Sequence, residues 1–472
     1  MARKHSFSRD NDSETTVKRY EEFLSGTSVA GYFDVEEFET IVEYYLRKGR
    51  TNESSRALEM GMKQHPGSST LQIKRAKIYL VGNDPMKAFR LLETLAEKDD
   101  LEVLQLKIEI LLKLNRDNEA LEICERLFSL INPKDADFVY LDIAYIYMNQ
   151  RKFEPAVKLL EKGLKYNPNS IDLLFELAYC FEQTIDLENA IKAHQHILRV
   201  DPFISEAWFN LGQIHFSLQD YEQALEAYDY VLAIDPTDSF CCIQKAHVLL
   251  NMEHYHKAIE CYNEYSNMSI DNKQVYSYIG ECYEKLEEFE TAISYYKKTL
   301  EFEPESYEAL TGLSICLLEQ EKYDESIVYI RQAIKAQPEY PDAWVYMGEA
   351  FIGMNDSESA LRAYMKALDC DPDQPETLIA VGNLQLEKMD YFSALYYYNL
   401  AYNRNKESEH INLLLGIAHF KLGEVETALA YLQEALEADE NAVAVFLEIC
   451  PEASSLANPK DLMTNLDKND TN

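Results

Sequence analysis

The apolar positions of this chain fall into short stripes that recur every 34 residues. In residues 205–236 the two stripes are formed by Trp208, Leu211, Gly212, Ala224, Tyr228 and Val231. Each stripe has the period of about 3.6 residues that an amphipathic helix shows, and the polar stretch LQDYE at 218–222 separates the two. The pattern therefore predicts two short antiparallel helices joined by a turn.

The helix pair is one member of a long series. Proline marks the end of a unit at Pro168, Pro202, Pro236, Pro304, Pro338 and Pro372, with spacings of 34 or 68 residues. Counting from residue 35 to residue 442 gives twelve units, with a one-residue slip expected around Asn132 and Pro133. If residue 205 is position 1 of its unit, position 20 is Ala in ten units and Ser in two, and position 8 is Gly in five, among them Gly212 and Gly348. Small residues at these positions are expected where two helices cross closely.

Two units carry the signature of a known repeat. The matching residues are Trp208, Leu211, Gly212, Ala224, Tyr228 and Pro236, and Trp344, Met347, Gly348, Ala360, Tyr364, Ala367 and Pro372. With them the chain resembles the tetratricopeptide repeat family over residues 35–442. The resemblance implies an all-α fold, a right-handed α-solenoid or superhelix of about twelve 34-residue helix–turn–helix repeats, each sharing its core with its neighbours.

The ends of such an array need covering. We expect a capping helix over residues 16–34 and a second over 443–456, where AVAVFLEI begins a thirteenth unit that Pro451 interrupts. The polar segments 1–15 and 457–472 are expected to be disordered.

The charge balance narrows the choice of partners. There are 82 acidic and 45 basic residues, a net charge of −37, which disfavours nucleic acid and anionic membranes and favours basic proteins or peptides. No apolar run approaches the length of about 18 residues that a membrane span needs, and no secretory signal opens the chain, so we expect no membrane insertion and a cytoplasmic location.

The sequence offers no catalytic constellation. His194 with His196, and His254 with His256, have a spacing that directs the two rings to different sides of a helix, which does not suit a metal site. Cys180, Cys282 and Cys316 all fall at position 10 and are expected to be small buried side chains. We therefore expect no enzyme activity, no metal and no cofactor.

Candidate binding residues lie on the first helix of each unit, which is expected to line the concave side of the stack. Positions 2, 5, 6, 9, 12 and 13 of that helix are predicted to be free of the repeat's own packing. The candidates at positions 6 and 9 are Asp142, Tyr145, Glu176, Tyr179, Asn210, Gln213, Gln244, His247, Tyr278, Glu281, Tyr346, Glu349 and Asn383. Their amide, phenol and carboxylate groups suit an extended peptide with polar or basic groups, whereas a merely solvated inner wall is the alternative.

Several functions fit this picture. The leading prediction is a non-enzymatic scaffold that binds a protein or peptide in the concave groove, and the alternative is an accessory, chaperone-like assembly factor or regulatory subunit. A carboxylate clamp for acidic tails is disfavoured, because position 5 holds residues such as Leu141 and Phe175 rather than lysine. The non-catalytic arm of a glycosyl-transfer enzyme and an RNA-binding pentatricopeptide array are also disfavoured, the first because residues 35–442 leave no room for a catalytic domain and the second by the strict 34-residue register and the negative charge.

Overall fold

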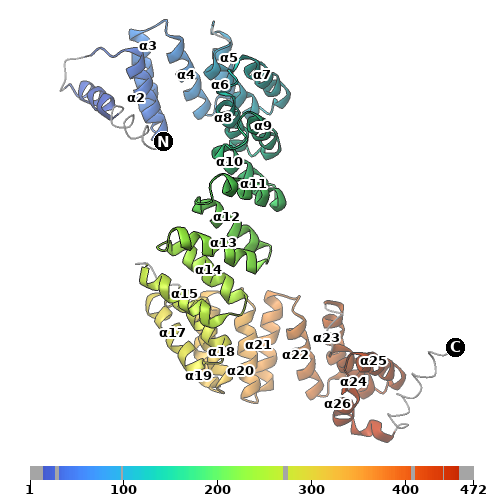
Figure 1. Cartoon of the computed structure of the whole chain (residues 1–472). Helices are drawn as coiled ribbons and strands as arrows, with labels where there is room; N and C mark the ends of the chain where they lie inside the picture. Colours follow the sequence, from blue (N-terminus) through green and yellow to red (C-terminus); the bar gives the residue numbers. More distant parts are fainter. Residues whose placement is uncertain are drawn as a thin grey trace, which may run out of the picture. The chain divides into compact units, whose positions relative to one another are not determined.

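A computed structural model describes residues 14–26, 31–96, 99–268, 275–404, 410–439 and 441–455, and these residues form helices and short connections without a strand. They belong to two compact halves that divide between Pro236 and Thr237 (Figure 1). Residues up to Pro236 form the N-terminal half, and residues from Thr237 form the C-terminal half.

The N-terminal half begins with a helix at residues 14–24. Its further helices are α2 (Val35–Arg47), α3 (Thr51–Gln64), α4 (Ser69–Val81), α5 (Pro85–Glu93), α6 (Leu101–Lys113), α7 (Asp117–Leu130), α8 (Ala136–Asn149), α9 (Phe153–Tyr166), α10 (Ile171–Gln183), α11 (Leu187–Val200), α12 (Ser205–Ser217) and α13 (Tyr221–Ile234).

The C-terminal half has the same alternation. Its elements are α14 (Ser239–Asn251), α15 (Tyr255–Met268), α16 (Val275–Lys285), α17 (Phe289–Phe302), α18 (Tyr307–Glu319), α19 (Tyr323–Ala336), α20 (Asp342–Gly353), α21 (Ser357–Cys370), α22 (Pro375–Glu387), α23 (Tyr391–Arg404), α24 (Ile411–Lys421), α25 (Val425–Ala438), α26 (Ala442–Ile449) and the 3₁₀ turn η1 (Pro451–Ser455).

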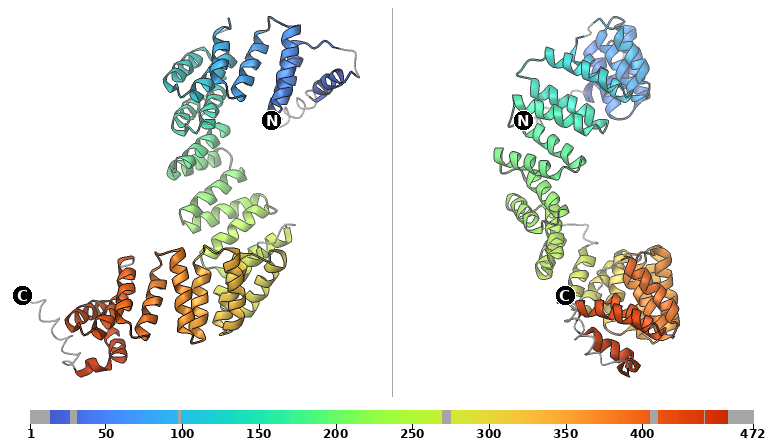
Figure 2. Two further views of the ribbon diagram at one scale, coloured as in Figure 1. Left: turned by 180° about the vertical axis from the view of Figure 1, so that it is seen from behind. Right: turned by 90° about the vertical axis from the view of Figure 1, so that its right-hand side faces the viewer.

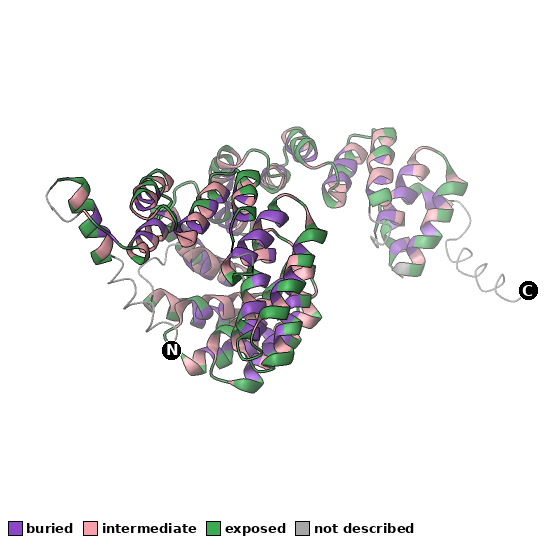
Figure 3. Cartoon of the chain, turned by 90° about the horizontal axis from the view of Figure 1, so that it is seen from above, coloured by how far each residue is buried: buried purple, intermediate pink, exposed green. Residues whose placement is uncertain are grey.

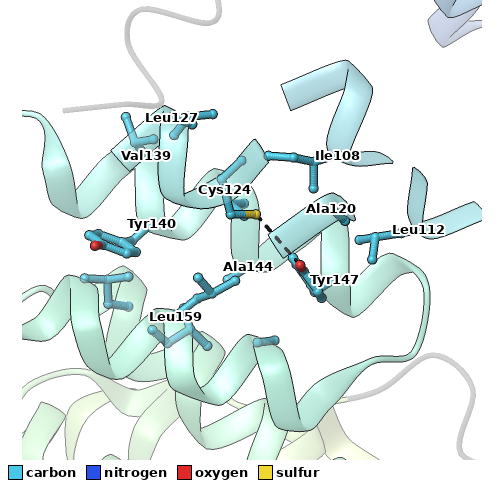
Figure 4. Close-up of a cluster of buried hydrophobic side chains, with 14 of the residues drawn as sticks. Ile108, Leu112, Ala120, Cys124, Leu127, Val139, Tyr140, Ala144, Tyr147 and Leu159 are labelled. Atoms are coloured by element: carbon cyan, nitrogen blue, oxygen red, sulfur yellow. Dashed lines mark hydrogen bonds between the residues drawn. The ribbon is translucent and has the colours of Figure 1, made fainter. Parts of the chain in front are cut away.

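Consecutive helices pack as pairs, from α2 with α3 to α24 with α25, and within each half most pairs also contact the next (Figure 2). Buried residues lie on the faces that the helices turn toward one another, and exposed residues lie on the outer faces (Figure 3). In one such core, Cys124 and Tyr147 pack among Ile108, Ala120 and Ala144 (Figure 4). The fold predicted from the sequence, an α-solenoid of about twelve helix pairs, is confirmed.

One residue in the turn of every pair has a left-handed backbone. These residues are Gly49, Asn83, Asn115, Arg151, Ile185, Gln219, Glu253, Glu287, Glu321, Asn355, Met389 and Gly423, with φ between 57° and 82°. They are 34 residues apart except on either side of Asn115, where the intervals are 32 and 36. The expected one-residue slip is therefore wrong: the third repeat starts two residues early because α5 is only nine residues long, and a longer connection after α7 restores the register.

Small residues at position 8 make room for an aromatic ring. A Cβ added to Gly212, Gly348 or Gly382 would lie 2.4–2.5 Å from ring carbons of Tyr228, Tyr364 or Tyr398, the residues at position 24 of the same repeats. Real side chains do not tolerate such distances, so the tyrosine ring occupies the space beside the glycine that a Cβ atom would need. In repeat four, Leu160 at position 24 is combined with a larger residue, Ala144, at position 8, whereas repeat twelve combines Leu432 with Gly416.

Both ends of the described chain bury apolar side chains. In the helix at residues 14–24, Val17 and Tyr20 are buried in one core with Phe33, Phe38 and Tyr45. Residues 14 and 15, expected to be disordered, are helical because the buried Val17 anchors the first turn. Among residues 443–456, α26 places Phe446 against α24 and α25. The rest of the predicted disordered segments, residues 1–13 and 457–472, lies outside the described residues.

Candidate functional site

The first helices of successive pairs lie close together. In the N-terminal half α2 contacts α4 and α6 contacts α8, and in the C-terminal half α16 contacts α18, which contacts α20. Among the described residues, no two second helices approach each other to the same extent. Because the first helices are crowded and the second helices are spread, each stack curves with the first helices on its inner face. All thirteen predicted residues lie on these first helices, where each is exposed or half-buried.

The inner face of the first three repeats contains a set of ion pairs. Lys74 has only 6% of its side chain exposed, and its Nζ lies 2.6 Å from Glu43 Oε1 and 3.0 Å from Glu102 Oε1. Lys77 reaches the same Glu102 oxygen at 2.6 Å. These lysines hold three successive first helices together.

The inner face of repeats four and five has no such lysines. Tyr145 donates a hydrogen bond of 2.7 Å to Glu176 Oε1, and Gln105 donates one of 3.3 Å to Asp142 Oδ2. Partial desolvation raises the pKa of Asp142, and partial desolvation together with Glu176 raises the pKa of Tyr145. Structure thus brings Asp142, Tyr145 and Glu176 into one polar strip, with the exposed Tyr179 on α10.

In the C-terminal half, a cluster of aromatic side chains lies in repeats seven and eight. The rings of His247 and Tyr278 meet edge to face with centroids 4.6 Å apart, and Tyr278 stacks on Tyr262 at 5.5 Å. The Tyr262 hydroxyl lies 2.8 Å from His247 Nδ1. Burial lowers the pKa of His247, so this imidazole is neutral at neutral pH and shares one hydrogen bond with the Tyr262 hydroxyl.

Carboxylates then accumulate over repeats eight to ten. Burial raises the pKa of Glu281, Glu284 and Glu349, and neighbouring carboxylates add to the effect at Glu284 and Glu349. The pKa of Tyr346 is raised to about 12 by burial and by nearby Asp342, Glu349 and Glu284. The nearest ammonium group is that of Lys285, 3.8 Å from Glu284 Oε1. Crowded carboxylates of this kind are stabilised by an approaching cation.

The prediction that positions 9 and 12 take no part in the repeat's own packing is wrong in four repeats. Tyr398 donates a hydrogen bond of 2.8 Å to Asn383 Oδ1, and Tyr262 pairs with His247, both at position 9. At position 12, Glu284 accepts a bond of 2.7 Å from Tyr296, and Glu182 lies 3.0 Å from Nε2 of the buried His194. A polar partner is needed there because the aromatic residue at position 24 brings a polar atom into the core. Glu182 and Glu284 were not among the predicted residues, although an acid at position 12 together with tyrosine or histidine at position 24 is a signal that the sequence contains.

The cysteines at position 10 are buried in the core. Burial raises the pKa of Cys180, Cys282 and Cys316 to about 12, so these thiols stay protonated and unreactive at neutral pH. Within the described ranges, no three His, Cys, Asp or Glu side chains are placed to hold a metal ion together. None of the described helices has the length and apolar character that crossing a membrane requires.

Stacked helix pairs with a curved inner face define an α-solenoid repeat protein. Sequence models of the tetratricopeptide repeat match residues 141–195, 205–238, 241–269, 283–341, 317–382 and 382–443, more than half of the chain. The chain therefore belongs to the tetratricopeptide repeat family, whose repeats generally serve as protein-interaction scaffolds. Repeats one to three lie outside these matches, but their helix pairs are present in the structure.

Several solved structures are similar to this chain. A tetratricopeptide repeat protein from Parabacteroides merdae ATCC 43184 is 20% identical, with a TM-score of 0.46 over 53% of this chain and 98% of that one. The APC/C hetero-tetramer Cut9-Hcn1 is 14% identical, with a TM-score of 0.39 over 89% of this chain and 91% of that one. YrrB, a tetratricopeptide repeat protein with an unusual peptide-binding site, is 22% identical, with a TM-score of 0.33 over 40% of this chain and 97% of its own. A search of curated proteins gives no match.

Proposed function

We propose that this chain is a non-enzymatic scaffold whose inner faces bind a protein or extended peptide that carries basic groups. The observation that carries the proposal is the cluster of glutamate side chains in repeats eight to ten. Burial raises the pKa of Glu281, Glu284 and Glu349, and Lys285 is the one ammonium group within 4 Å of any of the three among the described residues. A lysine or arginine side chain of a ligand would relieve this crowding with charge-assisted hydrogen bonds.

The tyrosines of the inner faces support the same proposal. Tyr145 and Tyr179 in the N-terminal half are exposed, and Tyr278 and Tyr346 in the C-terminal half are half-buried. A tyrosine offers a flat apolar surface and a hydroxyl group, and it loses little conformational entropy on binding. Asn210 and Gln213 add amide groups that can pair with a peptide backbone.

The experiment that tests the proposal compares proteins captured from a native lysate by the full chain and by two inner-face variants. The first variant is Tyr145→Ala/Glu176→Ala/Tyr179→Ala, and the second is Glu281→Gln/Glu349→Gln. The matched control neutralises three exposed acids of the outer helix α25, Glu426→Gln/Glu434→Gln/Glu437→Gln. A partner identified by mass spectrometry that is lost from an inner-face variant and kept by the control supports the proposal. The same partners on all four proteins would refute it.

A further inference from the structure

Two outer helices of the N-terminal half carry equivalent rows of cations. Lys158, Lys162 and Lys165 follow one another on α9 at the spacing of a single helical face. On α11, 34 residues later, the same three repeat positions hold Lys192, His196 and Arg199. Both helices pack on α10 (Figure 1), and the 34-residue spacing gives the two rows equivalent positions in successive repeats. We call these six residues the basic patch.

The basic patch stands out because most of its charge is unpaired. Lys192 pairs with Glu188 at 2.6 Å. Within the part of the chain that the structure describes, Lys158, Lys162, Lys165 and Arg199 form no ion pair, although all four are exposed and the chain carries 82 acidic residues. The acids on the same two helices are Glu154, Glu161 and Glu188.

A cavity opens beside the patch between α11 and α13. It has a volume of about 620 Å³, and the buried side chains of Leu198, Leu211 and Ala227 form its apolar floor. Trp208 and Glu226 also line the cavity, as does Arg199 of the basic patch. This size is within the range of about 300–1,000 Å³ that is typical of ligand pockets.

The cavity wall is fixed before any ligand arrives. The Trp208 indole stacks on Tyr230 with centroids 4.2 Å apart, and its Nε1 donates a hydrogen bond of 3.0 Å to the Pro202 carbonyl. A wall held in place in this way loses little entropy on binding.

We propose that the basic patch and the adjoining cavity bind an acidic amphipathic segment of a partner protein. An apolar side chain of that segment enters the cavity, and its carboxylates lie over the lysines of α9 and over Arg199. The apolar floor of the cavity favours a protein segment, which can supply an apolar side chain, over a nucleic acid. This outer site is separate from the proposed inner-face site and has the opposite charge preference.

The test begins with a selection of displayed random 15-residue peptides on the full chain. We expect the enriched peptides to be net acidic and to contain a large apolar residue. Fluorescence anisotropy of a synthesised enriched peptide then measures its affinity. The charge reversal Lys158→Glu/Lys162→Glu/Lys165→Glu should weaken binding by about tenfold or more, since three attractive charges become repulsive. The control Arg331→Glu/Lys335→Glu, on the outer helix α19, should bind as the wild type does.

A second measurement reports on the cavity without disturbing the charges. The chain has two tryptophans, so in a Trp344→Phe background the fluorescence comes from Trp208 alone. The enriched peptide should shift the Trp208 emission in proportion to binding. No enrichment, enrichment of basic peptides, an unchanged affinity after charge reversal or an unchanged emission would each overturn the proposal.

Two further outcomes identify a different occupant and also overturn the proposal. Binding of duplex DNA or phosphatidylserine vesicles that is lost on charge reversal would assign the patch to polyanions. A concentration-dependent dimer of the wild type that the charge reversal dissociates, measured by sedimentation, would assign it to a second copy of the chain.

Discussion

Glycine at position 8 and tyrosine at position 24 constrain each other's size within one repeat. We call this pair of residues the glycine–tyrosine interlock. Gly212, Gly348 and Gly382 each face a tyrosine ring that leaves no room for a Cβ atom. Repeat seven combines Ala246 with Tyr262, so alanine at position 8 is also compatible with tyrosine at position 24. The two positions should therefore be coupled energetically rather than independent.

Gly348→Ala should lower the free energy of unfolding by about 1–3 kcal/mol, because the new methyl group meets the Tyr364 ring. In a Tyr364→Leu background the same substitution should cost less, since Ala with Leu is the natural pair in repeat four. Urea unfolding of the two single variants and the double variant measures the coupling. Additive effects of the two substitutions would contradict the interlock, and Gly67→Ala, where nothing lies within 4 Å, is the control.

The raised pKa of Glu281 makes a prediction about pH. A carboxyl whose folded-state pKa exceeds its unfolded value binds protons more tightly when folded, so it contributes less stability as pH rises through that interval. Glu281→Gln should therefore raise the unfolding free energy at pH 7.5 relative to the wild type, and this advantage should shrink toward pH 4.5. Urea unfolding at both pH values is the measurement. A variant effect that is equal at the two pH values would show that burial does not penalise the Glu281 charge.

At the scale of elements, the turn of each helix pair depends on one left-handed residue. Asparagine tolerates this conformation, and three repeats use it, at Asn83, Asn115 and Asn355. Ile185 has φ of 61° although it is β-branched, and 82% of its surface is exposed, so little packing offsets the strain.

Ile185→Asn should therefore raise the free energy of unfolding by about 1 kcal/mol, because it relieves left-handed strain without removing a core side chain. The reverse substitution in another repeat, Asn355→Ile, should lower it by a similar amount. Thermal or urea unfolding of both variants would measure the difference. If Asn355→Ile proved as stable as the wild type, backbone strain would not govern these turns.

Elements were predictable from the sequence to the extent that their signals are local. The 3.6-residue stripes and the terminal prolines gave the helix pairs, since each signal lies within one repeat. The register around Asn115 was misjudged because a shortened α5 and a longer connection after α7 compensate each other. The roles of Asn383 and His247 were also missed as packing partners. Their hydrogen bonds depend on how one helix rotates against the next, which periodicity does not determine.

At the scale of the whole molecule, the extensive helix contacts among the described residues join elements that are at most two places apart in the chain. Ala292→Leu at a close helix crossing should therefore weaken amide protection locally, because the disturbance passes only through contacts between adjacent repeats. We expect faster hydrogen exchange in α16–α19 and unchanged exchange in α4–α9.

Hydrogen exchange followed by mass spectrometry would measure this, with Ser294→Leu on the exposed face of the same helix as the control. A uniform loss of protection along the entire chain would show that all repeats unfold as one cooperative unit instead.

The glycine–tyrosine interlock also bears on how such a chain grows. Both residues lie within one 34-residue stretch, so a duplication of that stretch copies the glycine at position 8 together with the tyrosine at position 24. Contacts such as that of Tyr145 with Glu176 join two different repeats, and a newly inserted copy would have to find them again. An ancestral array of this kind can lengthen first and acquire its surface afterwards, which leaves the interior uniform while each inner and outer face becomes individual.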